Sequence, residues 1–248
     1  MLMSVIRCTL FTPMRRVVEK IRINQIVSRF ILRNHVFSAK VSEKLVAFTF
    51  DDGPSPNTTL RLVDLFAKYQ GHASFFFQGN HAEQYPDIVK YAHAAGCSVC
   101  NHSYDHPLYN QVGTREMLRQ IRKTNDILEN ITGEKVKFLR PPGHRFTQWQ
   151  SLIIWLCCRQ PIVQANITPM DWTNISASTM ADFFCQYIKP GSIVCLHDAS
   201  HRTVEALELA LPVLYQQGYS FVSLHEMQRK GKLIPYRCGV LYDLKEQR

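Results

Sequence analysis

The stretch from residue 45 to residue 54, LVAFTFDDGP, decides the fold and raises the question of function. Six mostly apolar residues predict a buried strand, and the strand runs directly into two adjacent carboxylates, Asp51 and Asp52. Two neighbouring acids repel each other and gain nothing from burial, so their position needs a chemical reason. Adjacent residues on an extended strand point in different directions, so one acid can bind a cation while the other faces a cation-bound water.

The pattern of a short apolar strand followed by a helical stretch repeats from residue 45 onward. This alternation predicts an α/β fold, with a parallel sheet covered by outer helices. About seven strands in about 200 residues favour a closed or nearly closed (β/α) barrel over an open sheet. The expected strands are 45–50, 72–79, 97–103, 137–143, 161–167, 192–198 and 219–224, and the expected helices are 58–71, 83–96, 114–133, 151–158 and 203–218.

Charge divides the chain into parts. Residues 1–44 hold nine Lys and Arg against two acids, so they carry +7 of the net charge of +9. We therefore predict a basic N-terminal extension at 1–43, a main domain at 44–227 and a C-terminal tail at 228–248. A basic, partly apolar segment suits contact with an anionic membrane surface through residues 1–40, or it forms a solvated helix that packs on the main domain.

The cysteine pattern and the N-terminal sequence indicate in which cellular compartment the protein is expected. The eight cysteines are scattered and do not resemble a disulfide framework, and Arg7 interrupts the apolar run that a signal peptide would need. We expect a cytoplasmic protein, peripheral at most at the inner membrane face. The low charge of the main domain argues against a nucleic-acid partner.

Several polar side chains follow the ends of different predicted strands, where a parallel sheet brings them to one edge. NHSYDHP places His102 and His106 four residues apart, a spacing that puts both imidazoles on one side of a helical turn. Two histidines and one carboxylate, from Asp51 or Asp52, would leave one position of a metal open for water.

Three further groups fit the chemistry of such a site. Arg140, in FLRPPG, could hold an acid of the pair in its ionised form. His197, in SIVCLHD, could act as a general acid, and Asp171 could orient its imidazole and raise its pKa. Trp172 offers a flat face to a sugar ring.

The ordered motifs TFDDGP, HSYDH, RPPG, DW and LHD closely resemble the polysaccharide deacetylase family, the NodB-homology enzymes of carbohydrate esterase family 4. The resemblance covers about residues 44–227 and implies a distorted (β/α) barrel with a divalent metal cation, often zinc. It implies an N-deacetylase that releases acetate from an N-acetylated carbohydrate of the N-acetylglucosamine type. The implied roles are metal ligands Asp52, His102 and His106, base Asp51, acid His197, supporting residues Arg140 and Asp171, and substrate-binding residues Gly143, Trp172 and Leu196.

The chain departs from the family pattern at two places. Gly143-His144 stands where an aromatic residue is usual, so the backbone N–H that donates to the oxyanion is kept but an aromatic wall is lost. Cys97 and Cys100 form a CxxC beside His102, and we interpret them as packing thiols because no second CxxC follows. Two alternative functions stay open: a deacylase or deformylase of a lipid-linked amino sugar at a membrane, and a glycan-binding module without catalytic activity.

Overall fold

The computed structural model describes residues 34–235 and 242–243. Its central strand, β2 (Leu45–Asp51), is buried along its whole length and pairs in parallel with β3 (Ser74–Phe77) and β7 (Ser192–His197). The sheet continues on one side to β4 (Ser98–Asn101) and on the other to β6 (Ile167–Thr168) and β10 (Tyr242–Asp243). The short strand β8 (Ser220–Phe221) pairs with the beginning of β2.

The sheet curves into a distorted barrel through a connection without regular strand pairing. Leu139 makes isolated parallel bridges to Asn101 in β4 and to Ile162 in β5 (Ile162–Val163). Strand β5 pairs in parallel with β1 (His35–Lys40), which pairs antiparallel with β9 (Lys232–Pro235). The N–H of Ala39 in β1 donates to the carbonyl of Gly191 at 2.8 Å, which connects this smaller sheet to the start of β7.

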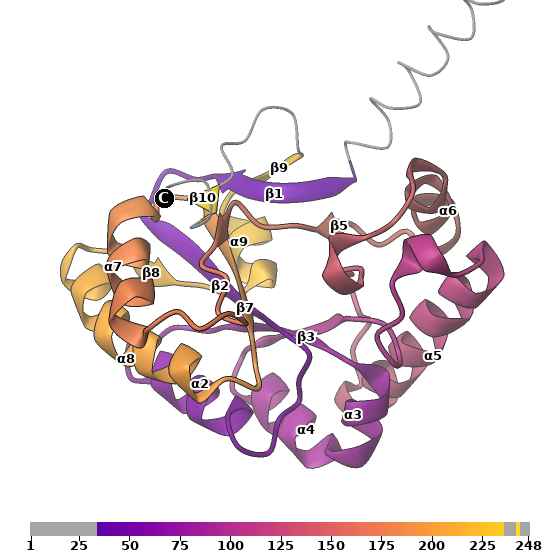
Figure 1. Cartoon of the computed structure of the whole chain (residues 1–248), viewed down its shortest axis with the longest axis horizontal. Coiled ribbons are helices and arrows are strands. Elements are labelled where there is room, and N and C mark those ends of the chain that lie inside the picture. The colour runs from indigo at the N-terminus through magenta and orange to yellow at the C-terminus, as the bar shows by residue number, and fades with distance from the viewer. Residues whose placement is uncertain (1–33, 236–241, 244–248) are drawn as a thin grey trace, which may run out of the picture.

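Helices surround the strands, as Figure 1 shows, and β1 and β9 lie together at one edge. Helix α5 is amphipathic over five turns and ends at Gly133, whose φ of 74° suits glycine. Helix α7 packs against α8, and α4 packs against α5. The α-helices are α2 (Thr59–Ala67), α3 (Gly79–Gln84), α4 (Pro86–Ala94), α5 (Thr114–Thr132), α6 (Gln148–Cys158), α7 (Ala177–Tyr187), α8 (His201–Gln216) and α9 (Leu224–Lys230); the 3₁₀ helices are η1 (Tyr109–Gln111) and η2 (Pro142–His144).

The two faces of β2 contribute to two different cores. Val46, Phe48 and Phe50 pack toward the helices in the largest apolar cluster, where the Phe48 and Phe66 rings lie 5.4 Å apart between centroids. Leu45 and Ala47 belong to a second cluster inside the barrel. Because side chains alternate along a strand, Thr49 and Asp51 also face the barrel interior, and this places one acid of the pair there.

The expected α/β barrel with a parallel sheet is confirmed, and the differences concern its ends. Residues 35–40, assigned to the basic extension, form β1, whose Val36, Phe37 and Ala39 are buried. Residues 228–235, assigned to the tail, complete α9 and form β9. The paired strands therefore extend beyond the predicted boundaries at 43 and 228, because the charge count over 1–44 does not reveal a short apolar strand, and the division into three parts stays a prediction. The rest of the predicted extension, residues 1–33, lies outside the described residues.

Candidate active site

The two acids of the opening stretch diverge where β2 ends. Asp51 is the last residue of the strand and is buried, with its side chain inside the barrel. Asp52 has a φ of 72°, which breaks the strand and turns its carboxylate toward a different set of neighbours. The sequence prediction that the pair divides between two roles thus has a geometric basis, with Asp51 on the barrel side and Asp52 at the rim.

Asp52, His102 and His106 bring their donor atoms to one point. The Oδ1 atom of Asp52 lies 3.4 Å from Nε2 of His102 and 3.3 Å from Nε2 of His106. A tetrahedral cation with ordinary Zn–N and Zn–O bonds separates its ligand atoms by about 3.3 Å. The donor types and their separations therefore fit a divalent metal held by three protein ligands.

Hydrogen bonds fix the orientation of these donors. Nδ1 of His102 lies 2.8 Å from the carbonyl oxygen of Arg140, and a carbonyl can only accept, so this nitrogen carries the proton. In the neutral imidazole, Nε2 of His102 is then the atom with the free lone pair, and it faces Asp52. The Nε2 amide of Gln78 donates to Oδ1 of Asp52 at 2.9 Å, which holds the carboxylate from the other side.

The HxxxH pair converges without the helical turn that its spacing suggested. Residues 102–106 form a loop, in which Ser103 has a φ of 67° and His106 a φ of 62°. The N–H of His106 donates to Oγ of Ser103, and the N–H of Tyr104 donates to Oε1 of Gln120. The helical interpretation of this segment is corrected: a hydrogen-bonded loop at the end of β4 brings the two rings to 5.1 Å between centroids.

Arg140 holds Asp51 in its ionised form. Its Nη1 donates to Oδ1 of Asp51 at 2.6 Å, and the guanidinium is fully buried, 4.1 Å from the ring centroid of Phe76. Burial by itself raises the pKa of Asp51, but Arg140 and the nearby histidines outweigh it and bring this pKa below its ordinary value. Asp51 is therefore a buried carboxylate that is ionised, and able to accept a proton, at neutral pH.

His197 and Asp171 form the pair that the sequence predicted. Nδ1 of His197 lies 2.8 Å from Oδ1 of Asp171, and the N–H of His197 donates to Oδ2 at 2.7 Å. Thr203 also donates to Oδ2 at 2.8 Å. Burial lowers the pKa of His197, but the bond to Asp171 outweighs it and raises the pKa to about 9. His197 is thus a protonated imidazole at neutral pH, as a general acid requires.

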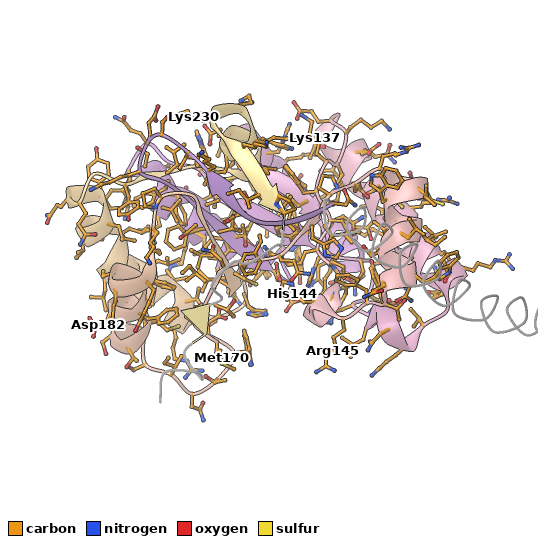
Figure 2. All side chains as sticks on the ribbon, turned by 90° about the horizontal axis from the view of Figure 1, so that it is seen from above. Lys137, His144, Arg145, Met170, Asp182 and Lys230 are labelled. Atoms are coloured by element: carbon orange, nitrogen blue, oxygen red, sulfur yellow. The ribbon has the colours of Figure 1, made fainter. Side chains whose placement is uncertain are left out.

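These groups line one pocket of about 240 Å³. The indole of Trp172 is half exposed at its rim, 5.1 Å from the ring of His197 between centroids. Figure 2 shows His144 between Met170 and Arg145 and farther into the molecule than either, with Lys137 and Lys230 on the opposite edge. The residues that line the pocket are Asp51, Asp52, His102, His106, Gly143, His144, Thr168, Trp172, Cys195 and His197.

The placement of Leu196 corrects one prediction. Leu196 is fully buried in the cluster beneath the helices, together with Val194. Alternation along β7 points Cys195 and His197 toward the pocket instead, so Cys195 forms the wall that Leu196 was expected to form. Cys195 could have been identified in the sequence, because it lies two residues before His197 and therefore on the same face of the strand. Gln78 and Thr203, which hold Asp52 and Asp171, carried no comparable signal.

The CxxC cysteines have a structural role, and the predicted membrane contact stays untested. Cys97 and Cys100 are buried, each in a different apolar cluster, which agrees with their interpretation as packing thiols. Among the described residues, no helix is both long and apolar enough to span a membrane. The predicted membrane contact falls mainly on residues 1–33, outside the described residues, and stays a prediction.

Comparison with known proteins identifies the family. The family model for polysaccharide deacetylase matches residues 38–150. A peptidoglycan-N-acetylglucosamine deacetylase of Bacillus cereus is 33% identical over 203 residues, covering 80% of this chain and 73% of that protein. The peptidoglycan-N-acetylmuramic acid deacetylase PdaC of Bacillus subtilis is 31% identical over 192 residues, covering 77% of this chain but only 40% of that longer protein.

A solved structure supports the same relationship. The crystal structure of the Bc1960 peptidoglycan N-acetylglucosamine deacetylase, in complex with an N-hydroxybenzamide derivative, superposes with a TM-score of 0.75. The two are 32% identical, and the match covers 82% of this chain and 96% of that one. With the ordered motifs and the converged site, these matches establish that the chain belongs to the polysaccharide deacetylase family, carbohydrate esterase family 4.

Proposed function

We propose that this domain is a metal-dependent hydrolase that removes N-acetyl groups from N-acetylglucosamine-type sugars in a glycan and releases acetate. The observation that carries the proposal is that one pocket holds three separate groups of side chains, each suited to a different part of the reaction. Asp52, His102 and His106 converge on one point, Asp51 is paired with Arg140 beside them, and His197 is paired with Asp171. Amide hydrolysis needs these three elements: an electrophilic centre, a base and an acid.

The donor set supports zinc as the cation. Two imidazoles and one carboxylate are the ligands of several catalytic zinc sites, with a further position left for water or substrate. When bound, such a cation polarises the amide carbonyl and lowers the pKa of water at the site. Asp52, His102 and His106 would hold it.

The remaining residues handle protons and charge. Asp51 accepts a proton from the attacking water, and Arg140 keeps Asp51 ionised beforehand. The N–H of His144 is already bonded to the carbonyl of Pro141 at 3.0 Å, so we assign the donor to the developing oxyanion to the N–H of Gly143. His197 donates its proton to the departing amine, and Asp171 keeps the imidazole in the required orientation.

The substrate is tested by incubating the zinc-loaded full chain with acetylated chitooligomers, peptidoglycan fragments and lipid-linked amino sugars. Mass spectrometry detects the loss of the acetyl group, and free acetate is measured in parallel. We expect acetate release from a soluble glycan, and release slower by about 10²-fold or more from the same protein carrying Asp51→Asn. Release only from the lipid-linked sugar would favour the membrane deacylase. Binding of glycan without acyl loss from any substrate would favour a non-catalytic module.

A further inference from the structure

A second cluster of potential metal ligands lies in the same pocket, and the proposed reaction uses only its Asp51. It consists of Asp51, His144 and Cys195, whose donor atoms all lie within 4.8 Å of one another. Sγ of Cys195 is 3.5 Å from Oδ2 of Asp51 and 3.8 Å from Nε2 of His144. A tetrahedral zinc ion bound by sulfur, nitrogen and oxygen separates these atoms by about 3.5 Å, so the cluster is near ligand geometry.

The surroundings of His144 are unusual for a histidine with only a packing role. Its Nδ1 atom is buried and has no hydrogen-bond partner among the described residues. Its backbone has a φ of 54°, in the left-handed region, and follows Gly143, whose φ is 57°. This turn brings the imidazole against Cys195 and Asp51 rather than outward. Burial lowers the pKa of His144 to about 4, so the ring is neutral and its lone pair is available.

From these contacts we propose that Asp51, His144 and Cys195 form a second cation site, selective for soft metals such as Zn²⁺ or Cd²⁺, which inhibits the enzyme by occupying its base. The proposed inhibition depends on the proposed function of the domain, whereas the proposed binding of a second cation does not. Binding breaks the S–H bond of Cys195, forms a metal–sulfur bond and releases one proton to water. The thiolate makes the site selective, because Mg²⁺ and Mn²⁺ prefer oxygen ligands.

Electrostatics makes this second site the weaker of the two. Nη1 of Arg140 lies 2.6 Å from Asp51 and 3.6 Å from Sγ of Cys195, so a positive charge is already present. The first site is adjacent, since Nε2 of His102 lies 3.9 Å from Oδ2 of Asp51. The cation must also displace the thiol proton. We therefore expect the first equivalent of zinc to occupy Asp52, His102 and His106, and the second site to fill only in excess.

The binding test uses metal-free full-length protein titrated with Co²⁺ or Cd²⁺. We expect two equivalents to bind, and only the second to produce the near-ultraviolet charge-transfer band of a metal thiolate. Cys195→Ser should lose that band and the second equivalent, and His144→Gln should weaken both. The matched control is Cys157→Ser, which removes an exposed thiol outside the pocket and should change neither. One equivalent without a band, or a band that persists in Cys195→Ser, would overturn the site.

The inhibition test compares acetate release at one equivalent and at excess zinc within each variant. Since a general base contributes about 10²-fold or more, occupation of Asp51 should lower the rate by about 100-fold. Each variant is compared with its own rate at one equivalent, and Cys195→Ser should keep that rate in excess zinc. Mg²⁺ in excess should not inhibit the parent protein. Equal inhibition of Cys195→Ser and parent would overturn the inhibitory role. A protein without any acetate release would refute the proposed function and leave the binding test valid.

Discussion

Replacing Asp171 by Asn should move the alkaline limit of activity to lower pH. Against the effect of burial, Asp171 makes the largest contribution to raising the pKa of His197 from 6.5 to about 9, and Asp51 and Asp52 add to it; the net shift is worth about 3 kcal/mol. The acid form of His197 is therefore present up to about pH 9 and is lost as the pH rises further. Without the negative charge of Asp171 the pKa of His197 should fall toward its ordinary value of 6.5, so at pH 8 the protonated fraction should fall from about nine-tenths to as little as about 3%.

The assay is the pH profile of kcat/KM for acetate release. Asp171→Asn should be up to about 30-fold slower than the parent at pH 8, and this factor should shrink below pH 6, where His197 is protonated in both. Asp182→Asn, which changes an exposed acid on α7, is the matched control and should leave the profile unchanged. A uniform loss of rate at every pH, with the alkaline limb still near pH 9, would refute the role assigned to Asp171.

Further predictions concern the stability of the site and substrate binding. Arg140→Met should cost about 3–5 kcal/mol in the free energy of unfolding, because it leaves Asp51 buried without its counter-charge. Arg61→Met removes an exposed ion pair with Glu208 and should cost under about 1 kcal/mol, so similar urea denaturation midpoints for the two variants would contradict the argument. Trp172→Ala should raise KM for chitooligomers more than it lowers kcat, because the indole lies at the pocket rim, and an unchanged KM would exclude a sugar contact.

The sequence predicts the central part of the fold better than its ends. Strands such as residues 45–51 are buried on both faces, so their apolar runs are conspicuous. Strand β1 is short and flanked by basic residues, and β9 is a partly exposed edge strand, so neither carries a strong periodic signal. The segment around Leu139 joins the barrel by isolated bridges, and its role depends on neighbours distant in the sequence.

In the site, too, some positions could be predicted from the sequence and others could not. Asp51, Asp52, His197 and Arg140 follow strand ends, and a parallel sheet brings strand ends together, so their proximity could be predicted. The loop geometry that joins His102 to His106 could not, because it depends on hydrogen bonds that the loop backbone donates to Ser103 and Gln120. The prediction for Leu196 was wrong because it took the neighbour of His197 in the chain, while the pleat of the strand selects Cys195.

The most direct test of the account replaces each acid of the opening pair by its amide. With one equivalent of zinc supplied, Asp51→Asn should retain the metal, measured by elemental analysis after gel filtration, and lose about 10²-fold or more in turnover. Asp52→Asn should lose both the metal and the activity, because Asp52 lies between the two imidazoles. If Asp51→Asn lost its zinc as completely as Asp52→Asn, the separation of base from metal ligand would be contradicted.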